Sequence, residues 1–164
     1  MLTNSAANND LNAIQKTPAA FTLDATKKAY FKTRLKVDSA TLAAFTVGLQ
    51  VVDTTPLDVT DGIYFLKSAG AATIDVLCRK DATTGSTSAS AIASVVADTF
   101  IELAWYYDGN GKVTYAVDGV VLGTLDGSST YFPDTILTVS LALSNGSAVA
   151  RTLTADFIYA AIER

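Results

Sequence analysis

The residues with the chemistry for catalysis are few and far apart in this chain of 164 residues. It has two glutamates, Glu102 and Glu163, and no histidine. Hydrolysis of a glycosidic bond needs two carboxyl groups on one face, about 5 Å apart for retention and further apart for inversion, whereas these glutamates fall in different predicted strands. The serines lie in no Ser-x-x-Lys or Gly-x-Ser-x-Gly segment and have no histidine to activate them. We therefore expect no catalytic residue and no enzyme activity.

Metal and redox chemistry have equally little support in the sequence. The absence of histidine removes the commonest zinc ligand. Asp53, Asp58 and Asp61 fall in one loop region and could offer oxygen atoms to calcium, but their spacing matches no calcium loop, and turn capping is the alternative. The single cysteine, Cys78, lies in an apolar strand-like run and is interpreted as an inert, half-buried thiol. We expect no metal site and no cofactor.

Aromatic residues are the first group that could support binding. Sugar binding without a metal would need aromatic platforms, for which the candidates are Trp105, Tyr106, Tyr107, Tyr115 and Tyr131. Trp105 is more typical of a buried indole. Aromatic residues are also enriched in the centres of protein interfaces. The sequence does not choose between these uses.

A basic strand is the second group. Five of the twelve cationic residues lie between Lys27 and Lys36, and Lys32, Arg34 and Lys36 would share one face. This face is either a solvated surface whose lysines prevent edge pairing or a docking face for an acidic partner. The candidate interface residues are therefore Lys32, Arg34, Lys36, Tyr64, Tyr106, Tyr131 and Phe132.

Short strands are the elements that would position these side chains. From Phe21 onward, apolar residues recur at every second position in runs bounded by Gly, Asp, Asn and Ser, which is typical of half-buried strands. Residues 99–125 contain two Asp-Gly turns and predict a three-strand meander. About ten strands with polar turns and no amphipathic helix predict an all-β, antiparallel β-sandwich.

Composition limits the class of protein further. We expect an irregular N-terminal arm with a weak edge strand over residues 1–18 and one β-sandwich domain over residues 19–164. The net charge of −4 disfavours a general nucleic-acid binder. No apolar run approaches the roughly 20 residues that a membrane span requires. Nucleic acid and membrane are therefore not expected as partners.

The run from Trp105 to Gly119 resembles the core hairpins of concanavalin A-like lectin/glucanase (laminin G-like) jelly rolls, which often contain W-x-x-x-x-D-G followed by V-D-G. The segments 31–37, 47–49 and 156–158 resemble other strands of that fold in the same order. The resemblance implies a jelly-roll sandwich. Such sandwiches usually have one more strand before the position of Leu2, so the sheet is either short by one edge strand or receives it from a neighbour.

Within that superfamily the chain is most similar to small bacteriophage virion proteins. The similarity rests on the Asn-Asn-Asp-x-x-x-Ile-Gln pattern that ends at Gln15, on Asp61-Gly62-Ile63 and on the final Asp-Phe-Ile strand. It implies a non-enzymatic head decoration or cement protein on the capsid surface of a virion. Its partners would be the major capsid protein or sister copies in a trimer or dimer. The alternative is a carbohydrate-binding module on a phage tail or adhesin, with a surface glycan as ligand.

Overall fold

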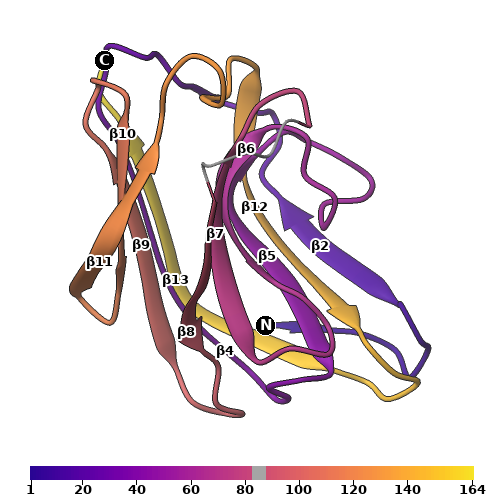
Figure 1. The fold of residues 1–164 in the computed structure, drawn as a ribbon. Coiled ribbons are helices and arrows are strands. Elements are labelled where there is room, and N and C mark those ends of the chain that lie inside the picture. The colour runs from indigo at the N-terminus through magenta and orange to yellow at the C-terminus, as the bar shows by residue number, and fades with distance from the viewer. Residues whose placement is uncertain (83–87) are drawn as a thin grey trace.

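The alternating apolar pattern forms two antiparallel sheets in this computed structural model (Figure 1). The structure describes residues 1–82 and 88–164. Residues 81–90 are a Ser/Thr/Gly/Ala stretch that predicts an exposed loop with a weak strand inside it, and this stretch lies partly outside the described residues. No helix in the described part of the chain is long and apolar enough to cross a membrane. The predicted all-β antiparallel sandwich is confirmed. The described residues form thirteen strands against the predicted number of about ten, in part because the two-residue strands, which carry no periodic signal, also pair.

One sheet has six strands, and β4 lies near its middle between β13 and β9. Its strands, in spatial order, are β1 (Leu2–Thr3), β13 (Thr152–Ile162), β4 (Ala29–Val37), β9 (Ile101–Tyr107), β10 (Lys112–Val117) and β11 (Val120–Asp126). The predicted meander of residues 99–125 forms β9, β10 and β11. Asp118 and Gly119 have φ angles of 49° and 79° at the second turn, the backbone conformation that the Asp-Gly pair predicts.

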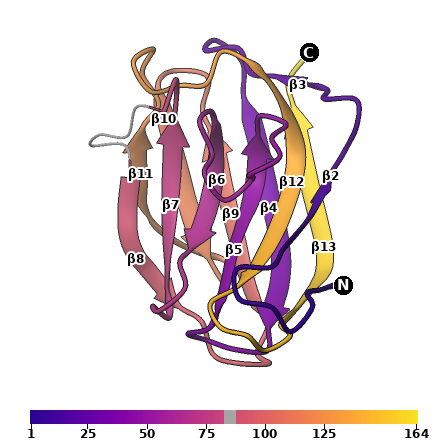
Figure 2. The same cartoon turned by 90° about the vertical axis from the view of Figure 1, so that its right-hand side faces the viewer.

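The other sheet has seven strands and faces the viewer in Figure 2. Its main path runs through β2 (Leu11–Gln15), β12 (Ile136–Asn145), β5 (Ala43–Gln50), β6 (Gly62–Lys67), β7 (Thr73–Arg79) and β8 (Ser88–Ser94), and β3 (Phe21–Thr22) also pairs with β12. Most neighbours in both sheets are distant in sequence. Such pairings are set by packing of the whole domain and not by local signals.

The core lies between the two sheets and is built from the inward residues of each strand. In β4, Phe31, Thr33, Leu35 and Val37 are buried, while the alternate residues Lys32, Arg34 and Lys36 point outward. Trp105 is 1% exposed and stacks on Phe31 with ring centroids 5.9 Å apart. The expectation that Trp105 is buried is confirmed. Burying a large apolar side chain of this kind contributes roughly 1.5–3 kcal/mol, so this stack helps to fix β4 beside β9.

The N-terminal segment is part of both sheets. β1 pairs with the start of β13, and β2 pairs with β12. Asn4 lies between the two strands, where its side-chain amide donates to the carbonyl oxygens of Asp10 and Leu143. Asn145 donates to Ser5 and Ala7 in the same way. Residues 1–18, predicted as an irregular arm with a weak strand, therefore contribute one edge strand to each sheet.

The β5–β6 connection, residues 51–61, lies against the outer face of the seven-stranded sheet, in front of β5 and β6 in Figure 2. Thr46 on β5 donates to the Pro56 carbonyl oxygen at 2.7 Å, and Arg79 on β7 donates to that of Val59 at 2.6 Å. Tyr64 is consequently 1% exposed. The outer face of the six-stranded sheet has no comparable covering segment among the described residues, and it remains the more accessible face.

Lys67 is a buried cation at the end of β6. Its side chain is fully buried, and its ammonium group donates to the carbonyl oxygens of Ala43 and Ser68. No carboxylate is paired with it in the described part of the chain. Burial therefore lowers the pKa of Lys67 to about 8, because the charged form loses hydration.

This burial predicts a pH dependence of stability. The unfolded lysine keeps a pKa near 10.5, so the unfolded chain binds more protons than the folded chain between about pH 8 and pH 10.5. The free energy of unfolding contributed by Lys67 should rise across that window, by up to about 3 kcal/mol. We expect the gain in free energy of unfolding of Lys67→Met over the wild type to be largest near pH 7 and smallest above pH 10. Urea unfolding of both proteins at each pH measures the difference, and parallel pH profiles would contradict the assignment.

Candidate functional site

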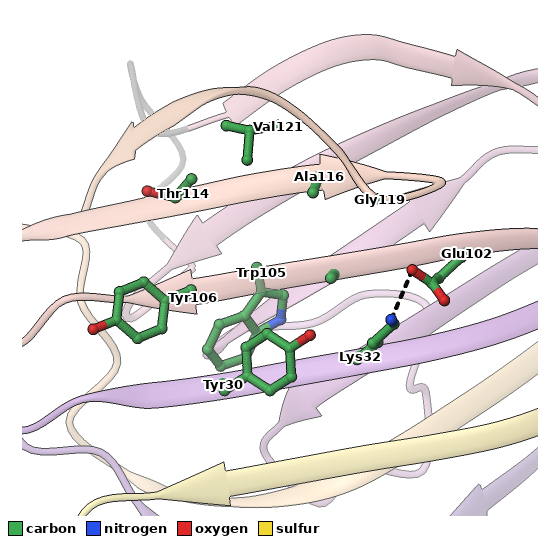
Figure 3. A pocket seen from close by; sticks show the side chains of 10 residues that line it. Tyr30, Lys32, Glu102, Trp105, Tyr106, Thr114, Ala116, Gly119 and Val121 are labelled. Carbon is green, nitrogen blue, oxygen red and sulfur yellow. Dashed lines mark ion pairs between the residues drawn. The ribbon is translucent and has the colours of Figure 1, made fainter.

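A shallow groove crosses the outer face of the six-stranded sheet. We call it the tyrosine groove, and it has a volume of about 200 Å³. It is formed by β4, β9, β10 and the start of β11 (Figure 3). Its lining residues are Tyr30, Lys32, Glu102, Ala104, Trp105, Tyr106, Thr114, Ala116, Gly119 and Val121. Apart from Trp105, whose side chain is buried in the core, the strands contribute outward residues. The groove therefore follows from the same alternation that builds the core.

Small side chains form the floor of the groove and aromatic rings form its wall. Ala104 and Ala116 are direct neighbours on β9 and β10, and Thr114 lies beside Tyr106. Tyr106 is 37% exposed and Tyr30 is half-buried. Figure 3 shows both tyrosine rings standing on the sheet beside this floor. Val121 on β11 bounds the opposite side and is 64% exposed. The result is an apolar surface with aromatic edges.

An ion pair closes one end of the groove. Lys32 Nζ lies 2.8 Å from Glu102 Oε1, and both side chains are partly exposed. The hydrogen bond with Glu102 raises the pKa of Lys32, with desolvation acting in the opposite direction. The backbone N–H of Glu102 donates to Asp118 at 2.8 Å, so the Asp-Gly turn between β10 and β11 holds this strand end in place. A fixed donor and a fixed acceptor therefore lie side by side at the groove.

A second hollow of about 220 Å³ lies on the other side of Tyr30 and Tyr106. It is lined by Lys28, Ala29, Tyr30, Tyr106, Ala161, Ile162 and Glu163. Glu163 accepts a hydrogen bond from the Lys28 backbone N–H at 3.1 Å. The two glutamates of the chain thus line different hollows, with the two tyrosines between them.

The structure brings some of the predicted interface residues together and separates others. Tyr106 lies at the tyrosine groove. Tyr64 and Phe132 are 1% and 4% exposed, so their side chains are interior and unavailable to a partner. Phe132 packs on the Tyr107 ring with centroids 4.1 Å apart. Tyr131 is half-buried in the β11–β12 connection, away from the groove.

The basic face of β4 is locally neutralised. Lys32, Arg34 and Lys36 point outward as the alternation predicts. Lys32 pairs with Glu102, and Arg34 Nη1 lies 2.9 Å from Asp156 Oδ2 on β13. Arg34 and Lys36 also lie over the Phe100 ring, at 4.4 and 5.2 Å from its centroid. A role of these three cations in docking an acidic partner stays a prediction.

Asp53, Asp58 and Asp61, the carboxylates considered as calcium ligands, have partners within the protein. Asp53 accepts hydrogen bonds from the backbone N–H of Thr55 and from nearby hydroxyls, which lower its pKa. Asp61 accepts from the Asp81 backbone, and Asp58 lies 3.6 Å from Arg79. Within the described residues, no three His, Cys, Asp or Glu side chains are grouped as metal ligands.

Sequence reasoning did not find the groove itself. It identified Tyr106 and Lys32 as separate candidates, but not the floor of small residues or the pairing of Lys32 with Glu102. The only available signal was the outward alternation of β4 and β9. β4 and β9 are neighbours through a long-range pairing, and this pairing sets the register that places Arg34 opposite Glu102. Local sequence patterns do not encode it.

Comparisons with known proteins support the fold and leave the function open. No family model and no curated protein matches the chain. Among solved structures, the carbohydrate recognition domain of Emp47p has a TM-score of 0.66 at 12% identity, covering 98% of this chain and 80% of that one. The Crh5 transglycosylase has a TM-score of 0.65 at 17% identity, covering 93% and 70%. These identities show the fold alone.

A protein of unknown function from Shewanella oneidensis MR-1 is also similar, with a TM-score of 0.62 at 11% identity over 95% of this chain. The chain spans 65% of the length of that protein. The predicted resemblance to concanavalin A-like lectin/glucanase sandwiches is therefore confirmed for the fold. The similar structures include both a lectin domain and an enzyme, so they do not fix an activity.

The remaining chemically reactive group, Cys78, is buried in the core of the sandwich. Its side chain is 1% exposed, whereas half-burial was predicted. Burial raises the pKa of the Cys78 thiol to about 12, so the thiolate is scarce at neutral pH. We expect Ellman's reagent to react with Cys78 in guanidinium chloride but at least about 100-fold more slowly in the native protein. Rapid reaction of the native protein would contradict this burial.

Proposed function

We propose that this protein is a non-enzymatic carbohydrate-binding domain and that the tyrosine groove is its binding site. The observation that carries the proposal is the combination of Tyr30 and Tyr106, a floor of small residues and the Lys32–Glu102 pair. A pyranose ring has one apolar C–H face that can pack on a tyrosine ring. Its hydroxyl groups can accept from the ammonium group and donate to the carboxylate.

The dimensions of the groove support a small saccharide unit. Its volume of about 200 Å³ lies below the ~300–1,000 Å³ of pockets for drug-sized ligands. The second hollow adjoins it at the two tyrosines, which gives a longer chain room to continue. Carbohydrate recognition is the printed role of the Emp47p domain, whose fold this chain shares. That similarity is support by analogy and the groove is the physical argument.

The non-enzymatic part of the proposal rests on the carboxylates. Each hollow is lined by one glutamate, whereas glycoside hydrolysis requires a pair at a single bond. Glu102 is already engaged by Lys32 at 2.8 Å. We propose that Glu102 orients a ligand and does not transfer a proton.

The test is glycan-array binding followed by calorimetry with the glycan that is retained. Tyr30→Ala and Tyr106→Ala should each weaken binding at least about fivefold, since aromatic contacts of this type contribute about 1 kcal/mol. Lys32→Met should also weaken it, because a donor is removed from the groove.

Val120→Ala is the control, because Val120 is 61% exposed at the β11 edge of the same sheet and lines neither hollow. It should bind as the wild type does. An array without any retained glycan, or equal affinity of Tyr106→Ala and wild type, would overturn the proposal.

We infer a second candidate function from the exposed apolar start of β11. Val120, Val121 and Leu122 are 61%, 64% and 47% exposed in succession, and a protein partner could cover them. A head decoration or cement protein on a phage capsid surface, bound to capsid protein or sister copies, is consistent with this feature and with the sequence resemblance.

This second proposal predicts that the protein is a stoichiometric component of purified virions. Quantitative mass spectrometry of the particles, with density for the β-sandwich in electron micrographs, measures this. Absence from purified particles would exclude it, and reduced particle binding of Val121→Asp relative to Val149→Asp, a similarly exposed control, would support it.

A further inference from the structure

Strand β13 has an open edge in the six-stranded sheet. It runs from Thr152 to Ile162, and β4 pairs with it along almost its whole length. On the opposite side, β1 pairs only with Thr152 and Leu153. Among the described residues, residues 154–162 have no strand neighbour on that side. This edge does not depend on the tyrosine groove or on the proposed function.

The direction of the peptide groups follows from the ladder. The Glu163 N–H donates to Lys28 next to the start of β4, at 2.9 Å. Because peptide groups in an antiparallel ladder alternate between neighbours, those of Tyr159 and Ala161 also point to β4. The N–H and C=O groups of Ile158, Ala160 and Ile162 therefore point to the open edge. They form a row that one further antiparallel strand would satisfy.

The side chains along this edge are apolar on both faces of the sheet. Ile158, Ala160 and Ile162 face inward and are only partly buried against the core. Phe157 and Tyr159 face outward and are 38% and 54% exposed. Residues 157–162 contain no charge, no proline and no bulge, since the bulge of β13 lies between Ala155 and Phe157. Edges of monomeric sheets are usually protected by such features, so this stretch is suited to being covered.

The other long edge strands are different. β11 is bulged in its pairing with β10, and β8 is bulged in its pairing with β7. Bulges twist an edge away from further pairing. The edge strand β2 is regular and uncharged but has only five residues. Among the edges of the described residues, β13 offers the longer regular, uncharged stretch.

We propose that the open edge of β13 binds the same edge of a second copy of this chain, forming a two-fold dimer with one continuous antiparallel sheet. The edge is self-complementary when Ala160 lies on the two-fold axis, because Ile158 then lies opposite Ile162 of the second copy. Asp156, which already pairs with Arg34 of its own chain, then lies opposite Arg164 of the second copy, so like charges do not meet at this end. β1 pairs with Thr152 and Leu153, which lie outside the stretch 156–164 that pairs in this register, so β1 leaves that stretch free.

The direct test is a symmetric cross-link. Antiparallel hydrogen-bonded neighbours have Cα atoms about 5.5 Å apart, within the range that a disulfide spans. Ala160→Cys should form a disulfide-linked dimer of twice the 17.2 kDa chain mass under mild oxidation. Val120→Cys is the matched control, because Val120 is 61% exposed at the opposite edge of the same sheet. The native thiol, Cys78, is buried and gives little background.

The second test is dimer stability in analytical ultracentrifugation. Ala160→Pro removes an N–H that points outward and retains the bonds to β4. Tyr159→Lys places like charges near each other across the two-fold axis, and its surface position keeps the test valid if the proline variant fails to fold. We expect each folded variant to raise the dimer dissociation constant at least about tenfold, and Val120→Lys to leave it unchanged.

A wild-type chain that stays monomeric up to about 200 µM would overturn the proposal, even if a different partner binds the β13 edge. Equal cross-linking at positions 160 and 120 would overturn it as well, and so would a dimer that is insensitive to both β13 variants. Slow amide exchange of Ile158, Ala160 and Ile162 in the dimer only would support it.

Discussion

The structure depends on the burial of inward-facing apolar side chains between the two sheets. β4 shows this constraint most clearly, because Phe31 and Leu35 are fully buried and Phe31 stacks on Trp105 of β9. Once these residues face inward, the residues at alternate positions of the strand must face outward. Tyr30, Lys32 and Arg34 therefore reach the outer face as a consequence of core packing. The tyrosine groove exists because β9 and β10 place alanine and threonine beside them on that face.

The sequence predicts the parts of the fold that local patterns encode. Alternation identifies β4, and the Asp-Gly pairs identify the turns around β10. The burial of Tyr64 and Phe132 was not predictable in this way, because it depends on segments that fold back from elsewhere. Residues 51–61 read as a polar loop, yet they cover β5 and β6 through the bonds of Thr46 and Arg79. The N-terminal strands β1 and β2 also have a weak sequence signal. They are ordered by pairing with β13 and β12, and not by their own strand propensity.

The charges on the outer face of the six-stranded sheet also depend on long-range pairing that local sequence patterns do not predict. The sequence shows a cluster of cations on β4, which indicates a positive surface. The register places Glu102 and Asp156 on the flanking strands β9 and β13, where each lies within 3 Å of one of these cations. Partly exposed pairs of this type contribute little to stability. They leave a face with oriented donors and acceptors and little net charge, a surface that suits neutral polar ligands better than acidic proteins.

The two accessible features of the six-stranded sheet are next to each other. Ala161 and Ile162 line the second hollow from β13, and the same strand carries the open edge. Pairing of two β13 edges would therefore place two tyrosine grooves on one continuous sheet face. A shallow groove binds a single saccharide unit weakly, since little surface is buried. Two such sites at a fixed spacing bind a repeating glycan far more tightly than either does alone, because the second contact is intramolecular. The small size of the groove is thus compatible with effective binding when the repeating ligand and the paired sheet have matching geometry.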